Sequence, residues 1–278
     1  MADFGLRGHT AAGCLSISVD ADLMGHGAAG AKGRTAAAES VLRELIDQFQ
    51  RHRLPASWAF SEPAATGLAR KLGEAPGHEI ALAADADVAP IDRSRGAFVR
   101  SVVDPLRRAA TNGIVISSLV LVGGWQPRHL DVLTKYGIRA VRSDRLIHSP
   151  NIRSSGVLAG YGARGEGVQI VCYGLWHVAT TFTLQGGGWM ANHAQMRLAR
   201  RAIDRTILQG GICHCRIDAA SLARSDSAVG LRHIDRFLRE MAQLRTGGRL
   251  DVRTLRSVAD LLAPKRTNSA ARSILRVA

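Results

Sequence analysis

The 278-residue sequence has no hydrophobic stretch long enough to cross a membrane. Its longest nearly apolar run, Gly113 to Trp125, is too short to span a bilayer and contains two serines. The first ten residues, MADFGLRGHT, lack the apolar segment that a signal peptide carries. We therefore expect a protein with no membrane-spanning segment and no secretory signal.

Cysteine is also scarce. The chain has four cysteines, and all lie in apolar, strand-like segments: Cys14, Cys172, Cys213 and Cys215. A small secreted scaffold would instead place its cysteines in a disulfide framework. The pattern predicts reduced, buried thiols in a cytoplasmic protein.

Lysine is rare, although the chain is strongly basic. The formal net charge is +14, and only four of the 37 basic residues are lysine. A basic balance is typical of proteins that bind nucleic acid, an anionic polysaccharide or a membrane surface. The arginines are spread along the chain with no interleaved aromatic residues, which favours a compositional bias. We expect no nucleic-acid partner; steep salt dependence of DNA or RNA binding would be the signature of that alternative.

Short apolar runs alternate with longer amphipathic segments along the whole chain. The predicted strands are Cys14–Asp20, Ala56–Phe60, Glu79–Leu82, Ile114–Val122, Ile138–Val141, Val168–Tyr173 and Gly211–Ile217. The predicted helices are Thr35–His52, Pro63–Leu72, Arg95–Thr111, Arg128–Tyr136, Ala191–Gln209, Ser227–Arg245 and Thr254–Leu262. This alternation indicates an α/β fold with parallel strands, because each crossover needs a connection of helix length.

No linker, repeat or glycine-rich dinucleotide motif divides the chain. We expect a single domain over residues 1–264, followed by a basic tail over residues 265–278. In parallel sheets and barrels the chemistry sits at the carboxyl ends of the strands. Those ends are therefore the place to look for a site.

The first predicted strand ends in two acidic residues. With a side-chain period of two, Ser16, Ser18, Asp20 and Asp22 share one face. Two carboxylates one step apart can hold a divalent cation, or can divide into a base and its orienting partner. A cap for the following loop is the structural alternative.

Several segments in order resemble the polysaccharide deacetylases of the NodB homology family. They are SVDADLMG (18–25), the helix and strand of residues 42–60, GHEIAL (77–82), residues 118–144, and GGICHCRIDAASL (210–222). The resemblance implies a deformed (β/α)7 barrel and hydrolysis of an N- or O-acyl group on a carbohydrate or glycoconjugate. It implies that Asp20 is the catalytic base and that Asp22 binds a metal ion.

The sequence departs from the family pattern at most of the other motif positions. Ala83 and Asp87 stand where the family has its two metal-binding histidines. The oxygen ligands that remain, Asp22 and Asp87, with Asp85 as a further acidic neighbour, suit Mg²⁺, Ca²⁺ or Mn²⁺ better than Zn²⁺. The cofactor is thus either a divalent metal ion or none.

The last motif is altered as well. Asp218 takes the place of the family's general-acid histidine, and strand alternation puts His214, Arg216 and Asp218 on one face. Asp218 or His214 could protonate a leaving group; alternatively, Asp218 is a structural partner for an arginine such as Arg216.

Three residues are candidates for contact with a saccharide. Trp125 and Arg128 lie in the loop where the family carries its arginine motif, and Trp189 follows a glycine-rich stretch from which its ring could stack on a sugar. The glycine-rich stretch could equally be a plain connection. Two functions remain open: a metal-dependent deacetylase, and a catalytically degenerate relative that binds a carbohydrate or another partner.

Overall fold

The computed structural model describes residues 13–21, 32–85, 94–122, 129–144, 168–172 and 174–263. The strands are β1 (Gly13–Asp20), β2 (Ala56–Phe60), β3 (His78–Asp85), β4 (Ile116–Val122), β5 (Ala140–Ser143), β6 (Val168–Cys172), β7 (Leu175–Ala179), β8 (Phe182–Leu184), β9 (Ile212–Asp218) and β10 (Leu250–Arg253). The helices are α1 (Lys32–His52), α2 (Gly67–Glu74), α3 (Arg95–Thr111), α4 (Leu130–Lys135), α5 (Trp189–Gln209), α6 (Ala219–Arg224), α7 (Ser227–Thr246) and α8 (Leu255–Leu262).

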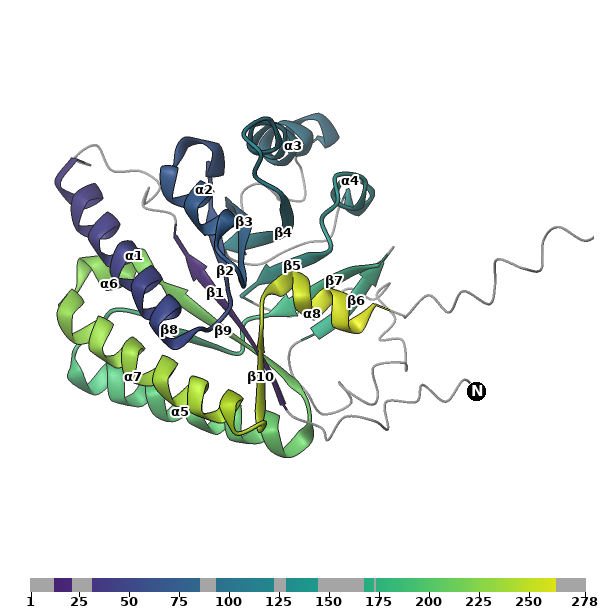
Figure 1. The fold of residues 1–278 in the computed structure, drawn as a ribbon. Coiled ribbons are helices and arrows are strands. Elements are labelled where there is room, and N and C mark those ends of the chain that lie inside the picture. Colours follow the sequence, from purple (N-terminus) through teal and green to yellow (C-terminus); the bar gives the residue numbers. More distant parts are fainter. Residues whose placement is uncertain are drawn as a thin grey trace, which may run out of the picture.

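All the strands belong to one curled sheet. Its order is β6-β7-β5-β4-β3-β2-β1-β9-β8, and β10 pairs with β1 beside this path. Every neighbouring pair is parallel except β6 and β7. Figure 1 shows the sheet curling into a half-barrel with helices along its outside. The predicted α/β fold of deformed-barrel type is confirmed.

The two faces of the sheet bury different side chains. In β1, Leu15, Ile17 and Val19 belong to the larger hydrophobic core, which includes residues of the outer helices α1, α5 and α7. The side chains that alternate with them, Ser16 and Ser18, are buried as well. From Leu15 to Asp20, the alternation in β1 therefore separates an outer apolar side from an inner polar side, as the strand period requires.

Helix α8 covers the inner face near the start of the strands. Its Leu255, Val258 and Ala259 pack with inner-face residues of β2, β3, β4, β5 and β7 in a second, smaller core. In Figure 1 α8 lies beside β5 and β7, apart from the group of α1, α5, α6 and α7. Helix α8 thus closes one end of the half-barrel, and the inner-face side chains of β1 and β9 beyond it include the polar Ser16, Ser18 and His214.

Some predicted elements need correction. The strand predicted over Val168–Tyr173 was expected to be parallel, but β6 runs antiparallel to β7. Only two residues separate the two strands, and so short a connection can join only antiparallel neighbours. The helix predicted over Pro63–Leu72 divides at Thr66, whose side chain caps α2 by accepting a hydrogen bond from Ala69 N at 3.2 Å.

The short elements β7, β8, β10 and α6 were not predicted. Each has three to six residues, too few for a periodic pattern to develop. The boundary predicted between residues 264 and 265 lies outside the described residues and stays a prediction. No helix in the described part of the chain is long and apolar enough to cross a membrane.

A buried ion-pair network at the candidate functional site

Three strands bring charged residues together at the carboxyl ends of the inner face. In register, Asp20 at the end of β1 lies opposite Asp218 at the end of β9, and Ser18 lies opposite Arg216. Strand β5 contributes Arg142, whose side chain is completely buried. Parallel strands end at one edge of a sheet, so residues far apart in the chain meet here.

Two arginines and two aspartates form the centre of this cluster. Arg142 Nη2 donates to Asp20 Oδ1, and Arg142 Nη1 donates to Asp144 Oδ1 at 3.0 Å. Arg216 Nε donates to Asp20 Oδ2 at 2.6 Å, and its Nη1 lies 3.1 Å from Asp144 Oδ2. We refer to Asp20, Arg142, Asp144, Arg216 and Asp218 as the ion-pair network. Each arginine bridges the two carboxylates, which compensates the charge of both.

The network leaves Asp20 little freedom. Both of its carboxylate oxygens accept hydrogen bonds from guanidinium groups that come from two different strands. Burial lowers the pKa of Arg216, but attraction to Asp20, Asp144 and Asp218 outweighs it and holds that pKa above its usual value. The predicted base is therefore held between two permanent cations.

Asp218 contacts both the first turn of α6 and the side chain of Arg216. Its Oδ1 accepts a hydrogen bond from Ser221 N at 2.8 Å and so caps the N-terminus of α6. Its Oδ2 lies 3.9 Å from Arg216 Nη2. Both oxygens thus face donors. This geometry agrees with the alternative in which Asp218 is a partner of Arg216.

His214 lies on the inner face of β9, in register with Ser16 of β1. Burial, followed by the nearby charges of Arg142 and Arg216, holds the pKa of its imidazole well below the usual value. Neither ring nitrogen has a hydrogen-bond partner among the described groups; nor do the buried hydroxyls of Ser16 and Ser18. A neutral imidazole is a poor general acid at neutral pH, because it lacks the readily released proton of an imidazolium.

No protein-family model matches the sequence, and no curated protein sequence matches it. Solved structures do match. A structure named as a polysaccharide deacetylase from Mycobacterium smegmatis is 12% identical, with a TM-score of 0.62 over 90% of each chain. Another so named, from Pseudomonas aeruginosa PAO1, is 11% identical, with a TM-score of 0.58 over 89% of each chain. The allantoinase PuuE is 10% identical, with a TM-score of 0.57 over 89% of each chain.

The chain has the polysaccharide deacetylase fold. The resemblance seen in the sequence is thus confirmed at the level of the fold. An allantoinase is similar to nearly the same extent, so the fold by itself does not decide the reaction.

The described residues do not supply the donor set that the resemblance implies for a metal ion. Ala83, which stands at the position of a metal-binding histidine, is buried in the smaller core beside Ala81 and Val120. Within the described part of the chain, no three His, Cys, Asp or Glu side chains are grouped closely enough to hold a metal ion. The two guanidinium groups on Asp20 also disfavour a cation beside it.

Four of the predicted site residues lie outside the described residues: Asp22, Asp87, Trp125 and Arg128. Trp189 begins α5, but its side chain is also outside them. The roles assigned to these residues stay predictions. The described structure therefore bears on Asp20, Asp218 and His214.

Two members of the network were missed from the sequence. Arg142 and Asp144 follow the short strand predicted over Ile138–Val141, in the segment Val141-Arg142-Ser143-Asp144. Alternating charged residues at the end of a predicted parallel strand were the available signal, the same one that drew attention to Asp20. The predicted strand ended one residue before Arg142, which placed the arginine in a loop.

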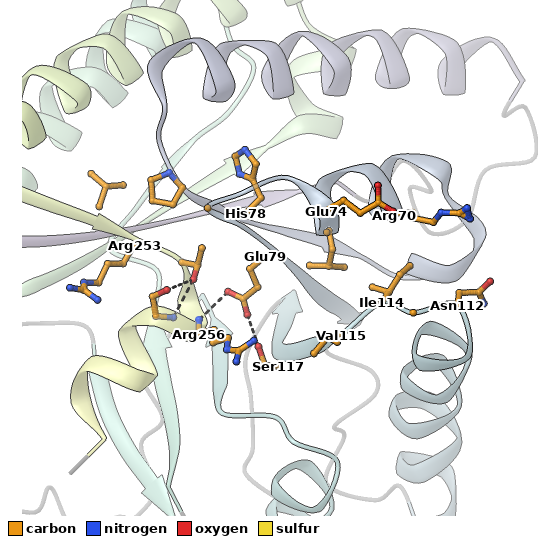
Figure 2. Close-up of a pocket in the computed structure, with 18 of the residues that line it drawn as sticks. Arg70, Glu74, His78, Glu79, Asn112, Ile114, Val115, Ser117, Arg253 and Arg256 are labelled. Carbon is orange, nitrogen blue, oxygen red and sulfur yellow. Dashed lines mark hydrogen bonds between the residues drawn. The ribbon is translucent and has the colours of Figure 1, made fainter. Parts of the chain in front are cut away.

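A second buried carboxylate, Glu79, lies at the opposite end of the strands and lines a cavity of about 830 Å³. Figure 2 shows Glu79 among the residues around this cavity. Glu79 Oε2 accepts hydrogen bonds from Ser57 Oγ at 2.8 Å and from Arg256 N, in the first turn of α8, at 3.0 Å. Its Oε1 accepts from the hydroxyls of Ser117 and Ser118. Glu79 is thus fully engaged in holding α8 to β2, β3 and β4, which gives it a structural role.

Proposed function

We propose that this protein uses the polysaccharide deacetylase fold to bind a carbohydrate without hydrolysing it. The observation that carries the proposal is the ion-pair network, in which both oxygens of Asp20 are hydrogen-bonded to arginines. A general base needs an oxygen that can reach the proton it removes. Breaking one of these buried pairs would leave a charge uncompensated, which opposes the use of Asp20 in a catalytic cycle.

The two candidates for the general acid support the same proposal. His214 is neutral and fully enclosed, with two arginines nearby. Asp218 directs one oxygen to the backbone of α6 and the other toward Arg216. Neither group is directed to protonate a leaving group at the end of the half-barrel.

A carbohydrate is the proposed ligand because two of the structural neighbours are named as polysaccharide deacetylases. Strands β1, β3, β4 and β5 present their carboxyl ends at the end of the barrel where parallel folds bind their ligands. The segment after β4 contains Trp125 and Arg128. An aromatic ring can stack on a sugar, and a guanidinium can donate to several hydroxyls.

Binding and turnover can be measured on the same preparation. Titration calorimetry with chitin and acetylated xylan oligosaccharides should detect binding that a chelator leaves unchanged. Acetate release should stay at background with Zn²⁺, Mn²⁺ or Co²⁺ present. Trp125→Ala should weaken binding, whereas Trp125→Phe, which keeps an aromatic ring, should retain most of it.

Hydrolysis is the second candidate. It is favoured by the convergence of three carboxylates, Asp20, Asp144 and Asp218, at the catalytic end of the fold. Acetate release that a chelator abolishes, and that Asp20→Asn abolishes while oligosaccharide binding persists, would establish this candidate and refute the first. The absence of both binding and turnover would refute both.

A further inference from the structure

The outward face of helix α5 carries an unusual concentration of exposed hydrophobic side chains. Five large hydrophobic residues are exposed in the described part of the chain, and three of them are on α5: Met190 at 77%, Leu198 at 59% and Leu208 at 86%. With 3.6 residues per turn they fall on one side of the helix, along a length of about 27 Å. These three side chains give the outward face of α5 apolar positions along its whole length.

Three arginines lie on the same side of α5. Arg197, Arg201 and Arg205 are exposed and spaced four residues apart, so they follow one another along the face. Arg197 and Arg201 make no ion pair or hydrogen bond with any other described side chain, whereas Arg200 turns aside to bind Glu240 of α7. We refer to Met190, Arg197, Leu198, Arg201, Arg205 and Leu208 as the α5 face.

The neighbouring helix extends the positive charge. The ring of His193 on α5 contacts that of His233 on α7, with 5.5 Å between their centroids. Burial, followed by the charges of His193, Arg236 and Arg232, lowers the pKa of His233, so both of these α7 arginines lie close to the junction of the two helices. Helix α5 itself has one acidic residue, Asp204, which is exposed on the same side of the helix and is outnumbered there by Arg197, Arg201 and Arg205. The surface around the α5 face is therefore strongly basic.

The opposite side of α5 anchors the helix to the barrel. Met196, Ala199 and Ile203 are buried in the larger core, and α5 contacts β1, β8, β9 and α7. Figure 1 shows α5 at the outer edge of the group of helices beside β9. Because its core side is already buried, the exposed leucines and methionine of α5 have no structural role in the described residues.

We propose that the α5 face docks this protein on the surface of an anionic lipid bilayer. The apolar side chains would enter the region between the headgroups, while the arginines contact the lipid phosphates and keep their apolar stems along the boundary. This proposal is independent of the carbohydrate site. A second copy of the chain is a poor occupant, because two such faces would bring their arginines together. Nucleic acid would engage the arginines but would leave the apolar side chains without a partner.

Vesicle co-sedimentation of the full chain tests the proposal. Binding is expected to phosphatidylcholine vesicles that contain phosphatidylglycerol, and not to phosphatidylcholine alone. It should weaken as added salt shortens the Debye length from about 10 Å to about 3 Å. The double variant Arg197→Gln/Arg201→Gln should bind about 25-fold more weakly, since each arginine near an anionic surface contributes a factor of about five. Leu198→Ser/Leu208→Ser should weaken binding by at least about tenfold.

The matched control is Arg70→Gln/Arg100→Gln, which removes the same charge from α2 and α3, across the molecule from α5 in Figure 1. It should bind vesicles as the parent does. Thermal unfolding should be unchanged in all three double variants, because every altered side chain is exposed. Equal binding to neutral and anionic vesicles, equal loss in the control, or binding to duplex DNA without binding to vesicles would each overturn the proposal.

Discussion

The two ends of the half-barrel each bury a carboxylate, and they stabilise it in different ways. At the carboxyl ends of the strands, Asp20 is held between the permanent charges of Arg142 and Arg216. At the amino ends, Glu79 is held by three hydroxyls and a backbone N–H, and its hydrogen bonds in the described residues include no ion pair. Removing one arginine from the first arrangement leaves a buried carboxylate without its full charge compensation. In the second arrangement the stabilisation of Glu79 is shared among four neutral hydrogen-bond donors.

This difference also separates the roles of the two ends. The Glu79 contacts attach helix α8 to the barrel, so that end is structural. The ion-pair network occupies the end where the fold would carry out chemistry, and it engages the very residues that chemistry would need. The two ends therefore differ in how their buried groups are stabilised, and the following substitutions test that difference.

The largest effect is expected for Arg142→Met. It removes a fully buried cation and leaves Asp20 and Asp144 with Arg216 alone, so the free energy of unfolding should fall by about 3–5 kcal/mol. Urea denaturation measures this loss. Arg43→Met, which breaks the exposed pair with Glu39, should lose less than about 1 kcal/mol. Adding Asp20→Leu to Arg142→Met should restore part of the stability; a further loss would show that the pairing is misassigned.

Acidification should destabilise the protein through two buried histidines. Burial lowers the pKa of His177 to about 4, and the pKa of His214 is also well below its usual value. Below pH 6.5 the unfolded chain binds protons that the folded chain does not, so the free energy of unfolding should fall by roughly 3 kcal/mol between pH 6.5 and pH 5.

Denaturation at a series of pH values measures this fall. His214→Leu should remove about half of the pH dependence, because one titrating group is lost. Above pH 7 the free energy of unfolding of the variant and of the parent should change with pH in the same way, because the histidines are neutral in the folded and in the unfolded chain. An unchanged slope at low pH would contradict the burial of a neutral His214.

A smaller effect is expected for Glu79→Gln. The amide keeps the size of the carboxylate but places one donor against hydroxyl and backbone donors, which should lower the free energy of unfolding by about 1–3 kcal/mol. Hydrogen exchange should accelerate most in the amides of α8. Glu74→Gln, an exposed change in the wall of the same cavity, should stay within about 0.5 kcal/mol of the parent. Equal acceleration along the whole chain would show that Glu79 does not anchor α8 in particular.

The smallest effect is expected for Asp218→Ala. Loss of the cap on α6 should lower stability by about 1 kcal/mol, and Asp218→Asn should recover most of it, because asparagine caps helices equally well. Thermal denaturation of the two variants separates the possibilities. If both variants lose the same stability, Asp218 stabilises the protein through its charge opposite Arg216 and not through the helix cap.

Local patterns predicted much of the fold. Strand β2 and helix α3 have the predicted bounds, Ala56–Phe60 and Arg95–Thr111. The alternation in β1 correctly separated Ser16, Ser18 and Asp20 from Leu15, Ile17 and Val19, which lie in the larger core. These features depend on neighbours in the sequence, so periodicity is sufficient to find them. Strands β7, β8 and β10 were missed because each is too short for a periodic pattern, and pairing with neighbouring strands defines them.

The site was predictable only in part, for the same reason. The sequence placed acidic residues at the ends of β1 and β9, but Arg142 is 122 positions from Asp20, and Arg216 is 196 positions away. Which charges compensate one another depends on strand order, and strand order is set by the packing of the whole chain. The sequence can therefore identify Asp20 as chemically important, but it does not show whether the carboxylate is free to react.

Residue types and their spacing thus decided the class of fold, the buried faces of the strands and the end at which charged groups gather. The tertiary structure decided that β5 and β9 each supply an arginine to Asp20. It also decided that Glu79 of β3 accepts a hydrogen bond from the backbone of α8. The physical reason lies in the range of the interactions. Hydrophobic periodicity acts over a few residues, whereas the partner of a buried charge is selected by proximity in space.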